Sequence, residues 1–480
     1  MSQTQMYING QWTGAESGRK LEVINPATEE AIEAVDYGSR AEAAAALEAA
    51  QRAFGDWKKT TPWQRGDVLR RIADLIRQRA DDIAQALTLE QGKPLAEAKA
   101  ETIVSALTFE WFGEEAKRIE GRWASTMVPE KRYLTMKHPV GVCAAISPWN
   151  FPVVLQARKI APALAAGCTV VSRPASQTPL SLIKVFQCIE EAGLPEGVVN
   201  LVMGPPGEIV EEFLVNPICR KISFTGSTEV GRELMRRAAD GVKRVSLELG
   251  GHAPVVIFDD VDPQEAAKTS VFGKFRNNGQ VCIAPTRFYI HEKLRRPFTE
   301  AAVEYAGQLK LGNGMEDGVE IGPMFEPKAM DKAQRLIDQA VGVGANVLTG
   351  GGRSTRFKKG YFFEPTVLDS IDARADLLTE EPFAPIMPIL SFDRIDEAIA
   401  RANDSIYGLA AYVMTHDITT AIRMAEGLEY GIVSVNDPVP AAVQSPFGGM
   451  KQSGIGRENS HEGLDAYLET KAVSFMLRQS

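Results

Sequence analysis

The feature that most constrains the fold is an alternation of short apolar runs with helical segments between residues 140 and 260. The runs cover residues 140–146, 169–171, 198–202, 221–224, 245–249 and 255–258. Strands separated by helices at this spacing are typical of βαβ units, which build a largely parallel sheet. A second α/β stretch covers residues 263–392, and a third alternation continues to residue 435. We therefore predict an α/β protein with two lobes.

The two ends of the chain have a different texture. Residues 7–35 hold short apolar stretches broken by Asn-Gly and Asn-Pro, which indicates small strands and turns. Apolar residues at helical spacing, such as Leu69, Ile72 and Ile76, predict helices from residue 39 to about 124. Residues 472–476 form a last strand-like run. We expect a small β element assembled from segments that are far apart in the sequence.

Composition excludes several classes of protein. The net charge of −9 argues against a nucleic-acid-binding protein, because phosphate contacts need a surplus of Lys and Arg. No apolar run reaches the roughly 18 residues of a membrane-spanning helix, and the first residues lack a signal-peptide pattern. The five cysteines show no paired spacing, and no Cys/His set has metal-ligand spacing. We expect a cytoplasmic protein with no disulfide framework, no bound metal, and no membrane or nucleic-acid partner.

Residues 221–235 have the pattern of a strand, a tight glycine turn at Gly226 and a helix. The free N–H groups and the dipole at the start of such a helix suit a pyrophosphate group. The pattern is neither G-x-G-x-x-G nor a Walker loop, which would need Gly-Lys-Ser/Thr. By itself the segment fits a dinucleotide site and a purely structural turn equally well.

Three further residues are candidates for catalysis. Cys282 follows a glycine turn at Gly279, and a thiolate there would be a nucleophile. Glu248 ends an apolar strand beside two glycines, where desolvation suits a general base. Asn150, in a loop braced by prolines, has an amide N–H for a developing oxyanion. Taken singly, each has a plain structural alternative: a buried apolar thiol, a carboxylate in an ion pair, and an Asx turn.

Seven sequence blocks, in this order and spacing, resemble the aldehyde dehydrogenase superfamily over nearly the whole chain. The blocks are Pro148-Trp-Asn-Phe-Pro, Pro174-Ala-Ser-Gln-Thr-Pro, Phe224-Thr-Gly-Ser-Thr, Glu248-Leu-Gly-Gly, Gly279-Gln-Val-Cys282, Glu381-Pro-Phe, and Pro446-Phe-Gly-Gly-Met-Lys-Gln-Ser-Gly. The resemblance implies a Rossmann-like cofactor domain over residues 1–121 and 139–249 and an α/β catalytic domain over residues 250–448. It also implies a small β oligomerisation element over residues 122–138 and 465–480, which would extend a sheet of the neighbouring subunit in a homodimer or homotetramer.

The resemblance also implies a reaction, the NAD(P)-dependent oxidation of an aldehyde to a carboxylate through a cysteine thioester. In it, Cys282 is similar to the family nucleophile and Glu248 to the base that deprotonates the hydrolytic water. Asn150 and the backbone N–H of Cys282 are similar to the oxyanion hole. A non-catalytic structural relative is the alternative from another class, and the retention of all three residues argues against it.

For the cofactor, the resemblance places Trp149, Gly226 and Ser227 in contact with NAD(P), and Glu381 with Phe383 at the nicotinamide ribose. Two positions depart from the usual family pattern at the adenosine ribose. Arg173 stands where the family usually has Lys, and its planar fork suits a phosphate. Ser176 stands where many NAD-preferring members carry a Glu that repels a 2′-phosphate. We therefore predict the use of NADP, with NAD as a further possible cofactor.

The substrate prediction depends on two arginines. The blocks around Arg276 and Arg158 resemble the succinate-semialdehyde and 2-oxoglutarate-semialdehyde dehydrogenases, in which corresponding arginines clamp a distal carboxylate. A bidentate guanidinium–carboxylate pair explains the choice of arginine, although each could equally form an ordinary ion pair. Against the clamp, Ala441 and Ala442 stand where that branch tends to offer a hydroxyl. We predict succinate semialdehyde as the substrate; 2-oxoglutarate semialdehyde, or a general aliphatic or aromatic aldehyde, is the alternative.

Overall fold

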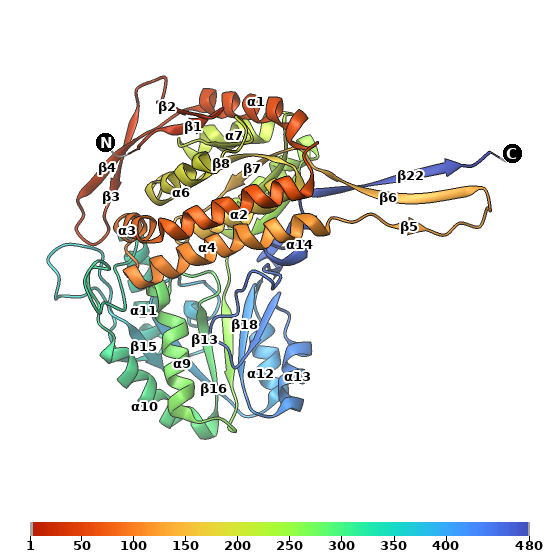
Figure 1. Ribbon diagram of the computed structural model, residues 1–480. Helices are drawn as coiled ribbons and strands as arrows, with labels where there is room; N and C mark the ends of the chain where they lie inside the picture. Colours follow the sequence, from red (N-terminus) through yellow and green to blue (C-terminus); the bar gives the residue numbers. More distant parts are fainter. Residues whose placement is uncertain (1–2, 479–480) are drawn as a thin grey trace.

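The computed structural model describes residues 3–478, which form two α/β lobes and a projecting β arm (Figure 1). The predicted α/β class and the division into two lobes are confirmed. The segments of the N-terminal half lie in the upper lobe of the view, and those between residues 253 and 435 lie in the lower one.

An eight-stranded sheet forms the centre of the first lobe. In spatial order it contains β2 (Gln11–Thr13), β1 (Met6–Ile8), β9 (Val199–Leu201), β8 (Thr169–Arg173), β7 (Val142–Ile146), β10 (Cys219–Thr225), β11 (Arg244–Glu248) and β21 (Gly454–Ile455). The five strands from β9 to β11 are parallel, β1 and β21 are antiparallel to their neighbours in this set, and β2 is antiparallel to β1. Ligands of open parallel sheets bind beyond the carboxyl ends of the strands, so this edge of the sheet is where a site is expected.

Helices cover this sheet. They are α1 (Arg40–Trp57), α2 (Pro62–Gln78), α3 (Ala80–Gln91), α4 (Leu95–Glu115), α5 (Pro152–Ala166), α6 (Leu180–Glu191), α7 (Pro206–Val215) and α8 (Thr228–Ala238). The helical stretch predicted for residues 39–124 is four helices. A capping box at Thr61 with Pro62 begins the second, and Gly92, at φ +98°, ends the third. The predicted end at 124 is wrong: the helix ends at Glu115, and Trp123–Ala124 is strand β5 of the arm.

The second lobe has a seven-stranded sheet. Its order is β14 (Asn346–Thr349), β15 (Thr366–Asp369), β16 (Ile386–Phe392), β13 (Pro285–His291), β12 (Ala253–Ile257), β18 (Ala410–Met414) and β19 (Ile432–Val435). All neighbours are parallel except β14 and β15. Its helices are α9 (Pro263–Phe275), α10 (Glu292–Gln308), α11 (Pro327–Gly342), α12 (Ile395–Asn403) and α13 (Ile418–Gly427).

Short elements complete the two lobes. They are the strand pairs β3 (Lys20–Ile24) with β4 (Ala31–Asp36) and β17 (Tyr407–Gly408) with β20 (Met450–Lys451), helix α14 (Ser460–Asp465), and the 3₁₀ turns η1 (Ala116–Arg118), η2 (Ala239–Gly241), η3 (Arg276–Gly279) and η4 (Asp376–Leu378). The β20–β21 segment returns from the second lobe to the edge of the first sheet, where Gly454 pairs with Glu248. Both lobes therefore contribute chain around residue 248.

The arm is a three-stranded antiparallel sheet of β22 (Leu468–Met476), β6 (Lys131–Pro139) and β5 (Trp123–Ala124). Its register runs from Leu468 opposite Pro139 to Met476 opposite Lys131. Figure 1 shows it extending away from both lobes. This is the predicted β element from distant segments, and the fold class is confirmed in this part as well.

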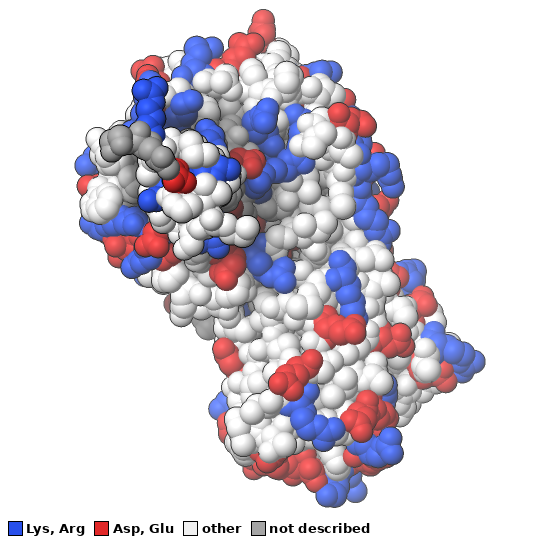
Figure 2. Space-filling view, turned by 90° about the vertical axis from the view of Figure 1, so that its right-hand side faces the viewer, with Lys and Arg blue, Asp and Glu red and all other residues white. Residues whose placement is uncertain are grey.

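The surface mixes both signs of charge. Figure 2 shows Lys and Arg interspersed with Asp and Glu over the lower lobe, and a hollow beside the base of the arm with basic groups at its rim. Among the helices of residues 3–478, none combines the length and the apolarity needed to cross a bilayer. All five cysteines are free, and Cys143, Cys168, Cys188 and Cys219 are buried, as expected for small apolar side chains.

Candidate active site

Cys282 lies between η3 and β13, at the junction of the two lobes, and its side chain is partly exposed. The segment after Glu248 packs directly on it: a β-carbon at Gly251 would come within 2.4 Å of the Cys282 carbonyl oxygen. Burial raises the pKa of the Cys282 thiol to about 12, and the charge of Arg158 opposes this rise. An anionic sulfur here therefore needs a nearby cation or a base that takes its proton.

Glu248 ends β11 and is only 3% exposed. Within the described part of the chain, neither of its carboxylate oxygens has a hydrogen-bond partner. Burial and then the neighbouring charge of Glu458 raise its pKa well above the ordinary value for a glutamate. The structural alternative considered above, a carboxylate held in an ion pair, is not what these contacts show. A carboxylate with two free acceptor oxygens is suited to receiving a proton.

Asn150 follows β7 in a loop at the carboxyl end of the sheet and is 3% exposed. Its Nδ2 donates to the carbonyl oxygen of Gln280, at 3.1 Å, two residues before Cys282. Because a carbonyl can only accept, this contact fixes which side of the amide carries the nitrogen. Nδ2 carries two N–H groups, so it has a second donor of the kind that an oxyanion hole requires.

Arg173 and Ser176 lie together at the carboxyl end of β8. The Arg173 guanidinium donates from Nη2 to Ser176 Oγ at 2.9 Å and to the carbonyl oxygen of Gly204 at 3.3 Å. The hydroxyl of Tyr37 lies 3.1 Å from the same Ser176 oxygen. Burial lowers the pKa of Arg173 to about 10, and its Nε has no partner among residues 3–478. A buried cation with an unused donor fits an anionic group.

Gly226 and Ser227 join β10 to α8. A β-carbon at Gly226 would lie 2.3 Å from the ring of Phe224, so only glycine fits there. The reason is the close ring, since Gly226 is not among the residues with a left-handed φ. Ser227 is the N-cap of α8, and its Oγ accepts from the N–H of Val230 at 3.4 Å. The start of α8 thus has the free N–H groups that a pyrophosphate needs.

Trp149, next to Asn150, stacks on Phe325 with the ring centroids 4.0 Å apart and an angle of 7°. Phe383 meets the same indole edge-on at 5.8 Å. Two predicted cofactor residues, from different lobes, are therefore in contact. Phe383 has φ +48°, a left-handed conformation that is strained for a bulky residue.

Glu381 is held at the same junction. Its Oε1 accepts from the backbone N–H of Gly251 at 3.2 Å, and burial raises its pKa to about 7. Lys274 is fully buried, and its Nζ has no hydrogen-bond partner in the described chain. Burial lowers the pKa of Lys274 to about 7, and the charge of Glu381 opposes this shift. Sequence reasoning assigned no role to Lys274. The signal that could have identified it is a lysine inside an otherwise apolar helical turn, eight residues before Cys282.

Arg158 and Arg276 approach the nucleophile from different elements. Arg158, on α5, is 7% exposed, and its guanidinium lies 4.5 Å from the centroid of the Phe447 ring. Its Nε has no partner among residues 3–478. Arg276 begins η3, and its charge acts on Tyr412 and on Glu97. The Tyr412 hydroxyl donates to the carbonyl oxygen of Ile283 at 2.7 Å, which ties this group to the turn after Cys282.

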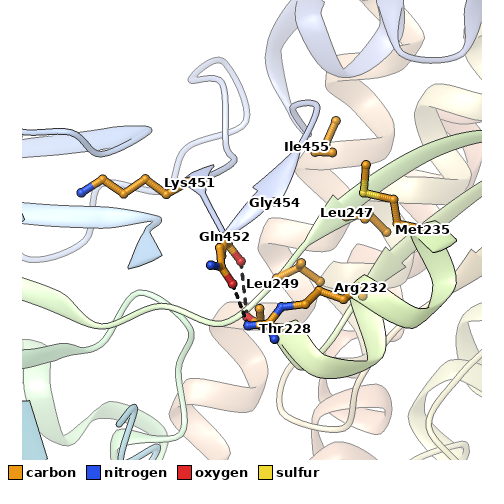
Figure 3. A pocket seen from close by; sticks show the side chains of 10 residues that line it. Thr228, Arg232, Met235, Leu247, Leu249, Lys451, Gln452, Gly454 and Ile455 are labelled. Carbon is orange, nitrogen blue, oxygen red and sulfur yellow. Dashed lines mark hydrogen bonds between the residues drawn. The ribbon is translucent and has the colours of Figure 1, made fainter. Parts of the chain in front are cut away.

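A separate pocket of about 480 Å³ lies between α8 and the 451–455 segment (Figure 3). Its wall is largely apolar, with Met235, Leu247 and Leu249 among the lining residues, and at its rim Arg232 donates to Gln452 Oε1 at 2.6 Å. None of the candidate site residues lines it. Side chains alternate along a strand, so Leu247 faces the sheet side opposite to Glu248.

The structure thus brings the candidates into two neighbouring groups. Cys282, Glu248 and Asn150 converge on the lobe junction, and Trp149, Phe383 and Glu381 lie beside them. Arg173, Ser176, Gly226 and Ser227 lie at the carboxyl ends of β8 and β10, along the same edge of the first sheet. No set of three or more His, Cys, Asp or Glu suited to a metal occurs among residues 3–478.

The fold and this site define the class of two-lobed α/β enzymes that carry a cysteine where the lobes meet. A sequence model described as the aldehyde dehydrogenase family matches residues 12–473. The chain belongs to the aldehyde dehydrogenase family, as its sequence blocks predict, and it is an enzyme that oxidises an aldehyde.

Relatives with known names support the same assignment. The glutarate-semialdehyde dehydrogenase of Pseudomonas putida is 45% identical over 467 residues, which cover 97% of this chain and 96% of the relative. The NADP(+) succinate-semialdehyde dehydrogenase of Escherichia coli is 44% identical, with the same coverage of 97% and 96%. The crystal structure of succinate-semialdehyde dehydrogenase from Burkholderia pseudomallei is similar, with a TM-score of 0.97, 45% identity and 98% of both chains covered.

Proposed function

We propose that this protein oxidises a short aldehyde carrying a distal carboxylate, with succinate semialdehyde as the preferred substrate and NADP as the preferred oxidant. The observation that carries the substrate proposal is Arg158, a buried guanidinium beside Cys282 with an unused Nε donor. A buried cation with a free donor is suited to a carboxylate. Relatives at 44–45% identity are named for succinate and glutarate semialdehydes, which supports the same class of substrate.

In the first half of the proposed reaction, the Cys282 sulfur adds to the aldehyde carbon. The thiol of Cys282, which is partly exposed, loses its proton to solvent, and the positive charge of Arg158 favours the anionic sulfur. The carbonyl oxygen becomes an oxyanion, which accepts hydrogen bonds from Asn150 Nδ2 and the backbone N–H of Cys282. When bound, the nicotinamide supplies the oxidising chemistry by accepting a hydride.

In the second half, water cleaves the thioester on Cys282. Glu248 removes a proton from the water as its oxygen attacks the thioester carbon, and the C–S bond breaks. The same two oxyanion donors stabilise the tetrahedral adduct. The products are the carboxylate and the Cys282 sulfur, which takes up the proton that Glu248 removed from water, so the site returns to its starting state. Among residues 3–478 neither oxygen of Glu248 has a hydrogen-bond partner, which suits this role.

The residues present fit NADP. Arg173, with its unpartnered Nε, and Ser176 would hold the 2′-phosphate, since a guanidinium and a hydroxyl both donate to phosphate oxygens. Gly226, Ser227 and the start of α8 would hold the pyrophosphate. We assign Glu381 and Phe383 to the nicotinamide ribose and Trp149 to a further contact with the cofactor. The name of the Escherichia coli relative includes NADP(+), which supports this preference.

The second arginine of the clamp is Arg276. Its position next to Tyr412, whose hydroxyl bonds to the turn after Cys282, supports a role at the same substrate end. Glu97 competes with the substrate carboxylate for the charge of Arg276. It accepts from the N–H of Asn277 at 3.0 Å, and the charge of Arg276 opposes the rise that burial causes in the Glu97 pKa. Arg158 is therefore assigned the larger part in binding the carboxylate, and Arg276 the smaller part.

We also propose the domain boundaries given by the sequence: residues 1–121 and 139–249 for the cofactor, 250–448 for catalysis, and 122–138 with 465–480 for assembly. The arm supports a role in forming a homodimer or homotetramer. It projects from both lobes and exposes apolar side chains, among them Trp123 at 64% and Phe475 at 45%. Patches of this kind mark interfaces between proteins. A cytoplasmic location stays a prediction from the sequence.

Steady-state kinetics on the purified protein tests the proposal. We expect kcat/KM for succinate semialdehyde to exceed that for butanal, an uncharged aldehyde of the same carbon number, by at least tenfold. Glutarate semialdehyde and 2-oxoglutarate semialdehyde measure the tolerated length and polarity of the acid. Equal values for butanal and succinate semialdehyde would sink the clamp and favour a general aldehyde as substrate. Each assay is run with NADP and with NAD.

A further inference from the structure

We propose that Lys93 is a positioning residue for oxyanion stabilisation: it fixes the backbone of Asn150 from a segment that touches neither substrate nor cofactor. The inference rests on the proposed oxyanion role of Asn150 and assigns the part that holds it in place. Lys93 follows Gly92, which ends α3, and it is 1% exposed. Its Nζ donates to the carbonyl oxygen of Asn150 at 2.8 Å.

The ammonium group of Lys93 has a partner for each of its three N–H donors. One is the Asn150 carbonyl, and the second is Glu101 Oε2 at 2.6 Å, in an ion pair with both side chains buried. The third is the face of the Phe151 ring, whose centroid lies 3.7 Å from Nζ. A buried lysine whose three donors all have partners is fixed in place. In the loop, Lys93 contacts Asn150 and Phe151.

Glu101, on α4, connects Lys93 to the helix that follows the loop. Its Oε1 accepts from the N–H groups of Val153 and Val154 at 3.0 and 3.2 Å, in the first turn of α5. The N-cap residue of α5, Phe151, makes no side-chain cap of its own. Glu101 therefore supplies, from another helix, the cap that the local sequence lacks. One buried ion pair thus holds both the Asn150 carbonyl and the first turn of α5.

A second donor reaches the same carbonyl from the nucleophile loop. Asn277 Nδ2 donates to the Asn150 carbonyl oxygen at 3.1 Å, and its Oδ1 accepts from Gln91 Nε2 at 2.9 Å. The Asn150 oxygen thus has two donors, one from the α3–α4 segment and one from the Cys282 segment. This arrangement sets the distance between the amide of Asn150 and the sulfur of Cys282, which a pair of oxyanion donors requires.

The test compares Lys93→Met, Asn150→Ala and the double variant, with NADP and succinate semialdehyde. We expect Lys93→Met to lower kcat by about 10- to 100-fold, because loss of one oxyanion donor costs on the order of 100- to 1,000-fold and the donor here is displaced, not removed. The KM of the aldehyde and the Kd of NADP should change by less than about threefold. In the Asn150→Ala background, Lys93→Met should lower kcat by less than about twofold, because the group that it positions is gone.

Lys221→Met is the matched control. Lys221 is also a fully buried lysine, 1% exposed, but its Nζ donates to Ser246 Oγ at 2.5 Å and does not contact the Asn150 loop. Its kcat should stay within about twofold of the wild type. If Lys93→Met fails to fold because Glu101 is left unpaired, Lys93→Met with Glu101→Gln removes both charges and keeps an oxygen for the α5 cap.

The outcomes separate the two proposals. An unchanged kcat in Lys93→Met, or an equal loss in both backgrounds, overturns the positioning role alone. An unchanged kcat in Asn150→Ala overturns the oxyanion role of Asn150 in the proposed function and, with it, the positioning role of Lys93. A loss confined to the background that retains Asn150 supports both.

Discussion

Gly251 lies directly on the carbonyl oxygen of Cys282, so that a β-carbon at position 251 would come within 2.4 Å of it. The end of the Glu248 strand and the nucleophile turn are therefore packed backbone to backbone. We expect Gly251→Ala to push the two segments apart and to lower kcat at least tenfold, since misplacement by about 1 Å costs on the order of 100-fold. Gly207→Ala is a control, because nothing lies within 4 Å of its added carbon; equal kcat values in both variants would contradict the prediction.

Glu248→Gln separates the two halves of the reaction. The amide cannot take a proton from water, so thioester hydrolysis should slow by about 100- to 10,000-fold. Rapid-mixing absorbance should still show a burst of NADPH that approaches one equivalent per active site. The same variant with Cys282→Ser should show no burst. A variant that turns over at the wild-type rate would remove Glu248 from catalysis.

The raised pKa of Glu248 predicts the direction of the pH dependence. A general base acts only when it is deprotonated, so kcat should rise with pH on its acid side. Because burial and Glu458 raise the Glu248 pKa well above its ordinary value, this rise should lie at higher pH than a typical glutamate gives. A kcat that stays flat from pH 5 upward, measured where hydrolysis limits the rate, would contradict the assignment.

Arginine substitutions test the carboxylate clamp. A charge-assisted hydrogen bond contributes about 1.5–3 kcal/mol, so Arg158→Ala should lower kcat/KM for succinate semialdehyde by roughly 10- to 150-fold. The value for butanal should fall less, because butanal loses only the effect of the Arg158 charge on the Cys282 sulfur. Arg276→Ala should show the same selectivity with a smaller loss, because Glu97 already screens that charge. Arg295→Ala, on the exposed part of α10, is a control for the loss of an arginine. Parallel losses for both aldehydes would exclude the clamp.

Ser176→Glu should reverse the cofactor preference. A carboxylate beside Arg173 would neutralise the guanidinium and repel a 2′-phosphate, and such repulsion costs about 2 kcal/mol or more. We expect kcat/KM with NADP to fall roughly thirtyfold, while the value with NAD stays level or rises. Ser176→Ala removes only the hydroxyl and should lose less. NADP kinetics unaffected by Ser176→Glu would place the 2′-phosphate elsewhere.

A buried carboxylate with no assigned part in the reaction predicts a pH-dependent stability. Glu90 on α3 is fully buried, accepts from the N–H groups of Leu180 and Ser181, and burial raises its pKa to about 8 from a model-compound value of 4.5. Between these pH values the native state holds a proton that the unfolded state has lost, so the free energy of unfolding falls as pH rises. In urea unfolding at fixed protein concentration, the free energy of unfolding of the wild type should fall by roughly 1 kcal/mol more per pH unit than that of Glu90→Gln. Identical slopes for both proteins would contradict the raised pKa.

Much of the fold was predictable because its signals are local and periodic. Five parallel strands of the first sheet fall on the apolar runs read from the sequence, displaced by one or two residues at their ends. The predicted end of the helical stretch was wrong because Trp123 belongs to the arm, where it pairs with Leu134. The spacing of apolar residues along a helix carries no signal for such a tertiary contact. Family resemblance located Cys282, Glu248 and Asn150, whereas composition and spacing alone left each with a structural alternative.

The residues that sequence reasoning missed are those whose roles depend on distant partners. Sequence reasoning assigned no role to Lys93, although its ammonium group donates to the carbonyl oxygen of Asn150, 57 positions later. Phe325 had no signal at all, because stacking on Trp149 depends on how the lobes come together. Buried charges such as Lys274 break an apolar pattern, and that break is the one clue a sequence offers to them.

The pairing of Leu468–Met476 with Lys131–Pro139 has a consequence for biosynthesis. The first strand leaves the ribosome more than 300 residues before its partner, so a nascent chain must carry it with an unsatisfied backbone edge throughout that interval. A polypeptide that stops short of residue 468 would keep the exposed edge permanently, together with the apolar groups of the arm. Premature termination shortly before residue 468 should therefore yield an aggregating species and not a truncated but soluble enzyme.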